Sequence, residues 1–362
     1  MATIINADTS NGLKLTSDTS GEIELQSAGV TKAKVTANGL QDASGNPITS
    51  QAGKNRIING NMMIDQRNAG ASVTTTNTVD YTIDRFRAVA LGTSLGFSSQ
   101  RNTTSPNGFA NSYLATVTSA KSVAATDQTR IDHFIEGYNV ADLNFGTANA
   151  KTITLSFWVR SSITGTYCVH IGNSTSPSRS FLAEYTISSA NTFEYKTITI
   201  SGDTTGTWTT VNGLGLGVSF VLGMGSNFTG SAGWQAGEKF QTSNQTQWIG
   251  TSGATFYITG VQLEVGEGAS DFENLPYDVQ LARCLRYFNY MSGNNIHAFH
   301  YGASNSIADV WFTVPMRANP TATYTSGSAG SSFNVQDNKK GYVFQGNQGD
   351  AYITTLKLSA EL

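Results

Sequence analysis

Charged side chains are scarce in this sequence. Lys, Arg, Asp and Glu make up 13% of the 362 residues, against about 25% in an average globular protein. The formal net charge is −3, and no basic run is longer than Lys339-Lys340. Nucleic-acid-binding proteins gather basic residues into a patch or stripe. The composition therefore argues against nucleic acid as a partner.

Cysteine is nearly absent, with only two residues in the chain. Cys168 and Cys284 lie far apart and form neither a Cys-x-x-Cys pair nor a disulfide framework. We expect both to be free, buried thiols in a protein that folds in a reducing compartment.

Long hydrophobic runs are also missing. The first residues have neither the charged nor the apolar segment of a signal peptide. The most apolar stretch, 211–224, is too short and too rich in glycine for a membrane-spanning helix. Read with a period of two, its large apolar side chains share one face, and Gly213, Gly215, Gly217 and Ser219 share the other. This pattern predicts a buried strand with one face cleared for close approach by a neighbour.

Glycine (37 residues) and aromatic residues (10%) are abundant instead, and short strand patterns bounded by turn signals recur from Lys54 to about Glu273. Segments 152–162, 165–172 and 193–200 are examples, and no long helical pattern interrupts them. The spacing predicts an antiparallel sandwich of two sheets.

The first 50 residues contain a repeat. Apolar pairs recur every ten residues at Leu13/Leu15, Ile23/Leu25 and Ala33/Val35, each with a charged residue between its members. We expect three short amphipathic strands joined by turns, which cannot be stable alone and need copies of themselves or a larger partner. Residues 40–53 have the composition of a linker.

The period of the pattern changes near the end of the sandwich. The apolar face of 256–265 switches parity at Gly260, which predicts a bulge there. From Pro276 the apolar residues follow helical spacing, so we expect a helix over 277–288. Residues 289–362 return to strand patterns that run to the last residue, which suggests a chain end held in a sheet.

Two segments, "KNRIINGNMMIDQRNAG" (54–70) with "YTIDRF" (81–86), and "FYITGVQLEVGEGASDFE" with "LARCLRYF", resemble the recurrent frame of phage fibre proteins. Residues 20–40 also resemble fibre anchors, and the likeness covers roughly 12–290. The resemblance implies an all-β chain in four parts. These are an N-terminal virion-anchoring β repeat with its linker (1–53), a jelly-roll β-sandwich like carbohydrate-binding modules (54–276), a connecting helix (277–288) and a C-terminal β-sandwich tip (289–362).

This resemblance implies a phage tail fibre in the virion, assembled in the host cytoplasm as a homotrimer. Residues 1–50 would dock on a tail or adaptor protein, and the distal β domain would bind a host surface glycan or an outer-membrane receptor. A head fibre or capsid decoration protein is the structural alternative, and a glycan depolymerase is the enzymatic one. We expect no enzyme activity and no membrane insertion.

The chain offers little catalytic or metal-binding chemistry. His297 and His300 form an HxxH pattern without a third ligand, so we expect no metal site and no cofactor. Scattered Asp and Asn residues still leave room for a structural calcium ion, although no loop has EF-hand spacing. Asp132 and Glu136 could form an acid/base pair, but we prefer to read them as solvated polar residues.

Two further sets of residues are candidates for structural or binding roles. For the first we prefer a network of charge-assisted bonds that fastens the first strands, over a sugar-binding cluster; it comprises Asn59, Asp65, Arg67, Asp84 and Arg85. We expect Asn59, Asp65 and Arg67 to share one face of a strand. Among the tryptophans at 158, 208, 234, 248 and 311, Trp158 is our candidate sugar platform. The receptor-binding candidates of the distal unit are His297, Phe299, His300, Tyr301, Ser304 and Asn305.

Overall fold

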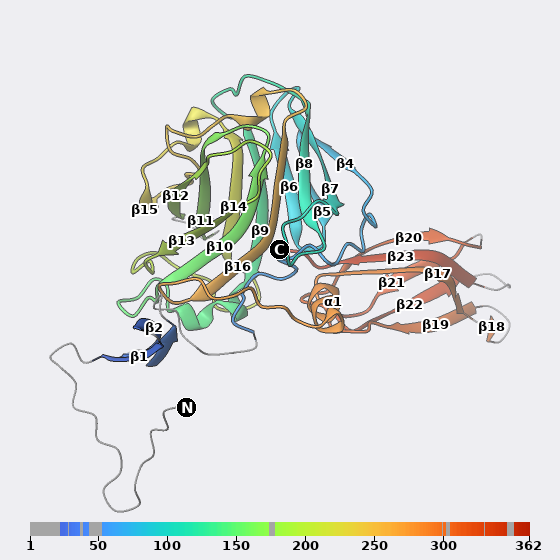
Figure 1. Cartoon of the computed structure of the whole chain (residues 1–362). Helices are drawn as coiled ribbons and strands as arrows, with labels where there is room; N and C mark the ends of the chain where they lie inside the picture. Colours follow the sequence, from blue (N-terminus) through green and yellow to red (C-terminus); the bar gives the residue numbers. More distant parts are fainter. Residues whose placement is uncertain are drawn as a thin grey trace, which may run out of the picture.

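The computed structural model of the chain describes residues 22–27, 29–36, 39–42, 53–173, 178–298, 300–301, 305–328, 330–345 and 351–362. Within these ranges almost all regular structure is β-strand, and α1 (Tyr277–Leu285) is the single α-helix. The predicted all-β class is therefore confirmed. Figure 1 shows a small N-terminal sheet, a large two-sheet sandwich and a C-terminal pair of sheets.

The large sandwich is of the jelly-roll type and consists of two antiparallel sheets that face each other. The six-stranded sheet has the order β13 (Glu194–Ile200), β10 (Ile153–Ser161), β16 (Thr255–Val265), β8 (Ser112–Ser119), β7 (Gly96–Asn102) and β4 (Val73–Thr76). The seven-stranded sheet has the order β15 (Gly233–Ala236), β12 (Arg179–Ile187), β11 (Gly165–Gly172), β14 (Leu214–Met224), β9 (Gln128–Glu136), β6 (Phe86–Leu91) and β5 (Thr78–Ile83). Short 3-10 helices lie in the connections, η1 (Gly137–Asn139), η2 (Ala141–Leu143), η3 (Ser226–Phe228) and η4 (Trp248–Gly250).

Strand β14 shows how the period-two pattern builds the core. Leu216, Val218 and Phe220 point between the two sheets and are fully buried. Each such side chain stabilises the fold by about 1.5–3 kcal/mol relative to exposure. The glycine and serine side of the strand faces away from this core. The predicted buried strand is confirmed over Leu214–Met224, whereas Val211 lies before the strand and is 56% exposed.

Gly260 lies at a bulge in β16, as the parity switch predicts. Gln262 pairs with Ser156 and Thr259 pairs with Trp158, so two residues of β16 oppose one residue of β10. Gly260 has a φ of +60°, a left-handed conformation that glycine adopts without the steric cost of a side chain. A Cβ atom there would lie 2.7 Å from the Phe109 ring and 3.1 Å from Trp158.

The substitution Gly260→Val is expected to lower the free energy of unfolding by about 1–3 kcal/mol. The valine would be strained by its φ and would also displace Phe109. Gly253→Val is the matched control, because Gly253 has a φ of +71° and no atom within 4 Å of a built Cβ. Thermal unfolding should show the larger loss for Gly260→Val. Equal melting temperatures for that variant and the wild type would contradict a requirement for glycine at the bulge.

The N-terminal sheet contains β1 (Ile23–Ser27), β2 (Val30–Thr36) and β3 (Gly39–Asp42) in that order. Of the three predicted strands, the first, around Leu13, lies outside the described residues. Strand β3 falls largely in the segment predicted as linker, which corrects that prediction at residues 40–42. The pairing explains the difference, since Val35 and Ala33 of β2 lie opposite Leu40 and Asp42.

Helix α1 is shorter than the predicted 277–288. It ends at Leu285, Arg286 is its C-cap, and the Tyr287 amide bonds to the Cys284 carbonyl. Phe288 instead starts a strand and pairs with Ser359, so sheet pairing overrides the helical spacing there. Tyr277, placed on the apolar face by its spacing, is 57% exposed. Among the described residues, no helix has the length and hydrophobicity needed to cross a bilayer.

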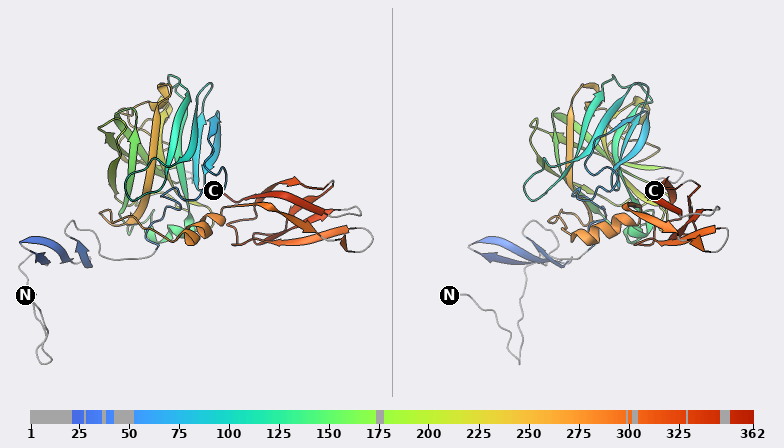
Figure 2. Two further views of the ribbon diagram at one scale, coloured as in Figure 1. Left: turned by 45° about the vertical axis from the view of Figure 1, so that its right-hand side comes forward. Right: turned by 90° about the vertical axis from the view of Figure 1, so that its right-hand side faces the viewer.

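The C-terminal unit is a small sandwich with its own core. One sheet has the order β17 (Phe288–Ala298), β23 (Ala351–Ser359) and β20 (Thr321–Ser326), and the other has β18 (His300–Tyr301), β19 (Asn305–Trp311), β22 (Lys340–Gln345) and β21 (Ser332–Val335). Phe312, Met316, Val343 and Leu356 are among the buried residues between them. The views in Figure 2 show this unit projecting from the base of the large sandwich beside α1.

The segment 54–70 contains no strand, which corrects the expectation that Asn59, Asp65 and Arg67 share a strand face. Asn59 and Met62 have φ values of +63° and +57°, so the backbone turns twice where a strand would stay extended. Met62 is nevertheless fully buried. The segment is a packed loop whose side chains fill the base of the large sandwich.

Candidate functional site

A cleft of about 400 Å³ lies on the outer face of the seven-stranded sheet. Its floor is made by side chains of β6, β9, β11 and β14 that alternate with core residues. In β9, for example, Ile131 and Ile135 enter the core, whereas Arg130, Asp132 and Phe134 line the cleft. The segment after β15 contributes Glu238 and Phe240 to the lining.

One cross-strand row of polar residues crosses this floor. Strand pairing places His170 of β11 opposite Ser219 of β14, Ser219 opposite Asp132 of β9, and Asp132 opposite Arg87 of β6. Directly opposite side chains in a sheet lie about 4.5–5.5 Å apart at Cβ. The four side chains therefore form a continuous line of donors and acceptors.

Asp132 is the centre of this row and is only 1% exposed. Its carboxylate accepts hydrogen bonds from Arg87 Nε (3.1 Å) and Nη2 (2.9 Å) and from Arg130 Nε (3.0 Å). Burial raises the pKa of Asp132, but the positive charges of Arg130 and Arg87 outweigh burial and hold the pKa below its ordinary value. Asp132 is therefore an ionised acceptor that fixes two guanidinium groups.

Aromatic rings hold these guanidinium groups from their other sides. The Arg87 guanidinium carbon lies 3.8 Å from the centroid of Phe134, and that of Arg130 lies 4.4 Å from the centroid of Phe240. Such cation–π contacts orient the planar group as well as stabilising its charge. The cleft is thus lined by oriented guanidinium donors beside the half-buried ring of Phe134 and the buried ring of Phe240.

His170 completes the row as a neutral side chain. Burial, together with the charge of Arg130, lowers the pKa of His170 to about 3. Its Nδ1 lies 3.4 Å from Ser219 Oγ, and its ring packs at 4.3 Å against Phe240. A neutral imidazole can donate at one nitrogen and accept at the other, which suits recognition of hydroxyl groups.

A second cross-strand row contains two glycines, which leave space above the floor of the cleft. Gly172 of β11 pairs with Gly217 of β14, and Gly217 pairs with Phe134 of β9. A Cβ at Gly217 would lie 3.2 Å from the Phe134 ring, so the glycine allows the ring to lie flat over the sheet. The glycine side predicted to be cleared for a neighbour thus forms part of the cleft floor.

The treatment of Asp132 and Glu136 as solvated residues is wrong. Each is 1% exposed. Glu136 accepts hydrogen bonds from Arg286 at 2.7 and 3.0 Å and from Tyr287 at 2.8 Å. Burial raises the pKa of Glu136, but these hydrogen bonds outweigh it and lower the pKa. The positive charges of Arg87, Arg130 and Arg286 offset the free-energy cost of burying the two carboxylates.

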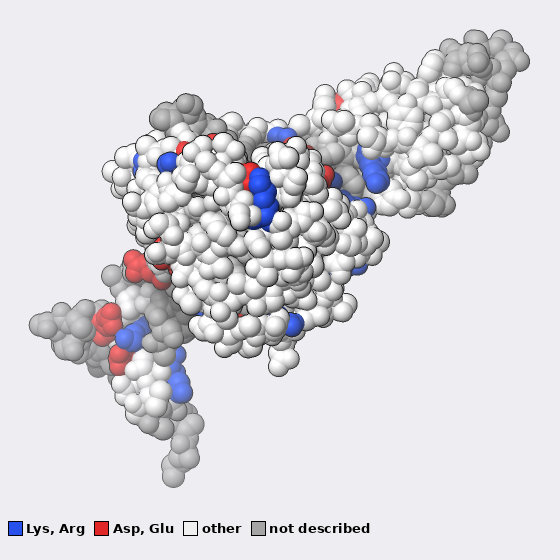
Figure 3. Space-filling model, turned by 90° about the horizontal axis from the view of Figure 1, so that it is seen from above, with Lys and Arg blue, Asp and Glu red and all other residues white. Residues whose placement is uncertain are grey.

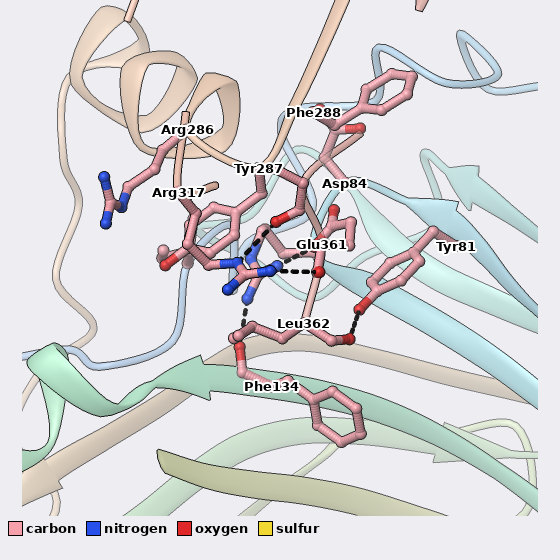
Figure 4. A network of polar contacts seen from close by, with 12 residues as sticks. Tyr81, Asp84, Phe134, Arg286, Tyr287, Phe288, Arg317, Glu361 and Leu362 are labelled. Atoms are coloured by element: carbon pink, nitrogen blue, oxygen red, sulfur yellow. Dashed lines mark hydrogen bonds and ion pairs between the residues drawn. The ribbon is translucent and has the colours of Figure 1, made fainter. Parts of the chain in front are cut away.

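The candidate network of the first strands gathers at the base of the large sandwich (Figure 4). Arg67 Nη2 donates to Glu361 at 2.6 Å, Arg67 Nε lies 3.5 Å from Asp84, and Arg85 pairs with the other oxygen of Glu361. Asp65 accepts hydrogen bonds from the Asn68 and Gly70 amides, and the Asn59 side chain donates to the Ile64 and Asp84 carbonyls. Sequence reasoning missed Glu361, since no local signal joins it to this group.

Burial shifts the pKa of one carboxyl group in this network. It raises the pKa of Asp84 to about 6, against the opposing charge of Arg67. The Arg85 guanidinium is 1% exposed and lies 3.6 Å from the Tyr287 ring. Tyr81 donates to the Leu362 carbonyl at 3.0 Å. The group fastens the end of β23 to the large sandwich.

The tryptophans are distributed over both sandwiches. Trp158 lies on the outer face of the six-stranded sheet, half-buried and 5.3 Å from Tyr195, on the opposite side from the cleft. Trp248 is fully buried in the core. Trp208 and Trp234 pack edge-to-face with Phe145. Trp311 is 65% exposed on β19.

The receptor-binding candidates are described only in part. His297 is exposed and its ring stacks on Tyr352 at 5.1 Å. His300, Tyr301 and Asn305 lie in strands β18 and β19, but their side chains, like Phe299 and Ser304 as a whole, lie outside the described residues. No group of three or more potential metal ligands occurs in the described part of the chain.

The surface seen from above has few charges. Lys, Arg, Asp and Glu side chains occur there in small scattered groups among uncharged residues (Figure 3). This face therefore lacks the single-sign patch that attracts a polyanion.

Comparison with known proteins gives only distant matches. No family model matches the chain, and no curated protein matches it. Among solved structures, it is similar to a CBM4 module (15% identity, 58% of this chain, 99% of that chain, TM-score 0.30). It is also similar to the family 11 carbohydrate-binding module of a cellulosomal cellulase of Clostridium thermocellum (10% identity, 56% of this chain, 98% of that chain, TM-score 0.28). A third similar structure is the xylan-binding domain CBM22-2 from Paenibacillus barcinonensis (14% identity, 51% of this chain, 94% of that chain, TM-score 0.27). Because TM-scores this low support no inference about binding, the ligand of this chain has to be inferred from its own cleft.

Proposed function

We propose that this chain is a virion fibre that adsorbs to a host cell-surface glycan, and that the cleft on the seven-stranded sheet is the glycan site. The observation that carries this proposal is the row His170–Ser219–Asp132–Arg87 beside the Phe134 ring. Sugars offer hydroxyl groups to such donors and acceptors, and their C–H faces pack on aromatic rings.

The role of a fibre draws its support from the sequence resemblance of residues 12–290. The sequence placed receptor contact in the distal unit, around Ile296–Tyr301. The cleft brings hydrogen-bonding side chains and an aromatic ring together in one hollow, so the proposal places glycan binding in the large sandwich. Binding without catalysis fits a carboxylate at Asp132 that two guanidinium groups already engage.

Replacement of Phe134 by alanine is expected to weaken glycan binding at least tenfold, or by about 1.4 kcal/mol. The change removes the ring that lines the cleft and frees Arg87. The probe is the oligosaccharide that the wild type binds best on an array of host-surface glycans, titrated by calorimetry. Phe193→Ala is the matched control, because Phe193 is also half-buried under an arginine, Arg160 at 5.8 Å, but lies away from the cleft.

Unchanged affinity in Phe134→Ala, or equal losses in both variants, would show that the cleft is not the site. A reducing-sugar assay on the same glycan separates binding from cleavage. Release of sugar by the wild type would favour a depolymerase over the fibre proposed here.

We further propose that the fibre is a homotrimer joined in part through the N-terminal sheet. Strand register places Ile23, Val35 and Leu40 in one row, and Val35 and Leu40 are 39% and 43% exposed. A sheet of three short strands with an exposed apolar face needs a partner surface for stability. Light scattering should give three times the 38.5 kDa chain mass, and Val35→Asp should lower it. A monomeric wild type at micromolar concentration would contradict this assembly.

A further inference from the structure

A second cavity, of about 210 Å³, lies between the base of the large sandwich and α1. Its lining includes the guanidinium-bearing residues Arg56, Arg283 and Arg286 and no acidic residue. Asn139 and Tyr287 also line it. A concave site with several guanidinium groups and no carboxylate in its wall is suited to an anion.

Two of these arginines already have acidic partners behind the wall. Arg286 is paired in a bidentate manner with Glu136, and Arg56 Nη2 donates to Asp142 at 2.8 Å. These two pairs balance two of the three positive charges. Arg283 then supplies the remaining charge of the cavity.

The Arg283 guanidinium has no hydrogen bond and no carboxylate within 4.0 Å in the described part of the chain. Its Nη2 lies near Gly53, 3.7 Å from where a Cβ on that glycine would be. The nearby Glu273 carboxylate accepts hydrogen bonds from the backbone amides of Gly53 and Asn55. The Arg283 fork therefore keeps its donors for a ligand.

Arg56 is held in place at the wall of the cavity. Its Nη1 donates to the Asn139 carbonyl at 3.1 Å, but its Nε is buried and has no hydrogen-bond partner. Buried donors in native proteins nearly always have a partner, and leaving one unpaired is costly. Because this Nε has almost no accessible surface, an oxygen in the cavity would meet Arg56 through its Nη atoms.

We propose that this cavity binds the carboxylate of an acidic sugar, such as a uronic acid, with Arg283 as its principal charge partner. Guanidinium forks bind carboxylates through two parallel hydrogen bonds. The exposed amide of Asn139 at the rim can meet sugar hydroxyls. The choice of a sugar carboxylate over other anions rests on the glycan-binding function proposed above, whereas the preference for an anion rests on the three arginines.

The cavity is a site separate from the cleft. Glu136, which holds Arg286, follows Asp132 by four residues on β9, or about 13 Å along the strand. One monosaccharide is too short to contact both places. Variants in either place should therefore affect different ligands, which keeps the two proposals separable.

The test titrates glucuronate, glucose, inorganic sulfate and a tetra-glutamate peptide into the full chain and follows binding by calorimetry and by the rise in melting temperature. Glucuronate is expected to bind more tightly than the other three. Arg283→Gln is expected to weaken glucuronate binding at least tenfold, and Arg283→Lys should retain part of it. Phe134→Ala in the cleft should leave it unchanged.

Arg160→Gln is the matched control, because Arg160, like Arg283, is half-buried and has no ion pair in the described part of the chain, but does not line the cavity. Unchanged glucuronate affinity in Arg283→Gln would overturn the inference. Equal binding of sulfate or of glucose would overturn the carboxylate-sugar assignment, and tighter binding of the peptide would assign the cavity to a protein partner. If no array glycan binds the wild type while glucuronate does, the fibre's glycan function fails and the acid site stands.

Discussion

Replacing Glu361 with glutamine is expected to lower the free energy of unfolding by about 3–5 kcal/mol, because it leaves a buried guanidinium without its counter-charge. Arg85 is 1% exposed and pairs with one oxygen of Glu361, and Arg67 pairs with the other (Figure 4). Glutamine keeps the size of the side chain but removes the charge that both arginines share. Urea unfolding at pH 7 measures the loss.

Glu267→Gln is the matched control, because Glu267 is exposed and its side chain has no ion pair among the described residues. Its substitution should change stability by less than about 0.5 kcal/mol. Should Glu361→Gln lose no more than this control, the Arg85 charge must be balanced by the Phe134 carbonyl and the Tyr287 ring alone.

The same substitution tests how the two sandwiches are joined. Beside Glu361, the Ala360 amide bonds to the Tyr287 carbonyl and Arg317 donates to the Ala360 carbonyl, both at 2.8 Å. The first bond holds the segment after β23 against the residue that follows the C-cap of α1, and the second lies within the C-terminal unit. We therefore expect Glu361→Gln to increase hydrogen exchange in 286–288 and 358–362 before it affects the core of the large sandwich.

Acidification from pH 7 to pH 5 is expected to destabilise the large sandwich, by about 2 kcal/mol through His170 alone. The pKa of His170 is lowered to about 3 in the folded protein, first by burial and then by the charge of Arg130. An unfolded chain has a histidine pKa of about 6.5. At pH 5 the unfolded state therefore binds a proton that the folded state rejects, so stability is present above about pH 6.5 and is lost as the pH falls.

Other groups modify this dependence in known directions. Burial and the charge of Arg85 lower the pKa of His133 well below its ordinary value, so His133 adds to the loss. Burial raises the pKa of Asp84 to about 6, so Asp84 contributes stability as the pH falls below that value and opposes the loss. Because His170 and His133 both lower the stability and Asp84 alone raises it, the free energy of unfolding falls between pH 7 and pH 5.

His170→Gln isolates the cleft histidine. Urea unfolding at pH 7 and pH 5 should show a difference in stability smaller by about 2 kcal/mol than in the wild type. His297→Gln, at an exposed histidine of β17, should leave the difference unchanged. A wild-type slope retained in His170→Gln would mean that this imidazole is protonated in the folded protein.

Some features of this chain are encoded locally and could be read from its sequence. The all-β class, the buried strand within 211–224 and the bulge at Gly260 all follow from a period of two and its interruption. Each depends only on residues close in sequence, because neighbouring side chains of a strand must point to opposite faces. The free, buried state of Cys168 and Cys284 is also as predicted.

Local patterns failed where a distant strand competed for the same residues. Helical spacing includes Phe288, but pairing with Ser359, seventy-one positions later in the chain's numbering, takes it into β17. The sequence 54–70 alternates like a strand, yet Asn59 and Met62 adopt left-handed turns. Burial of Met62 in the core and bonds from the Asn59 side chain to Ile64 and Asp84 decide that conformation.

Both candidate sites were decided by tertiary structure alone. Arg87, Asp132, Ser219 and His170 become a row only through the register of four strands, and register is a property of paired strands, not of any one segment. Glu361 meets Arg85 across 276 positions, and Glu136 meets Arg286 across 150. The sequence determined which residues alternate between core and surface. Folding determined which charges face one another, because ion pairs form between side chains that the sheets bring together from distant parts of the chain.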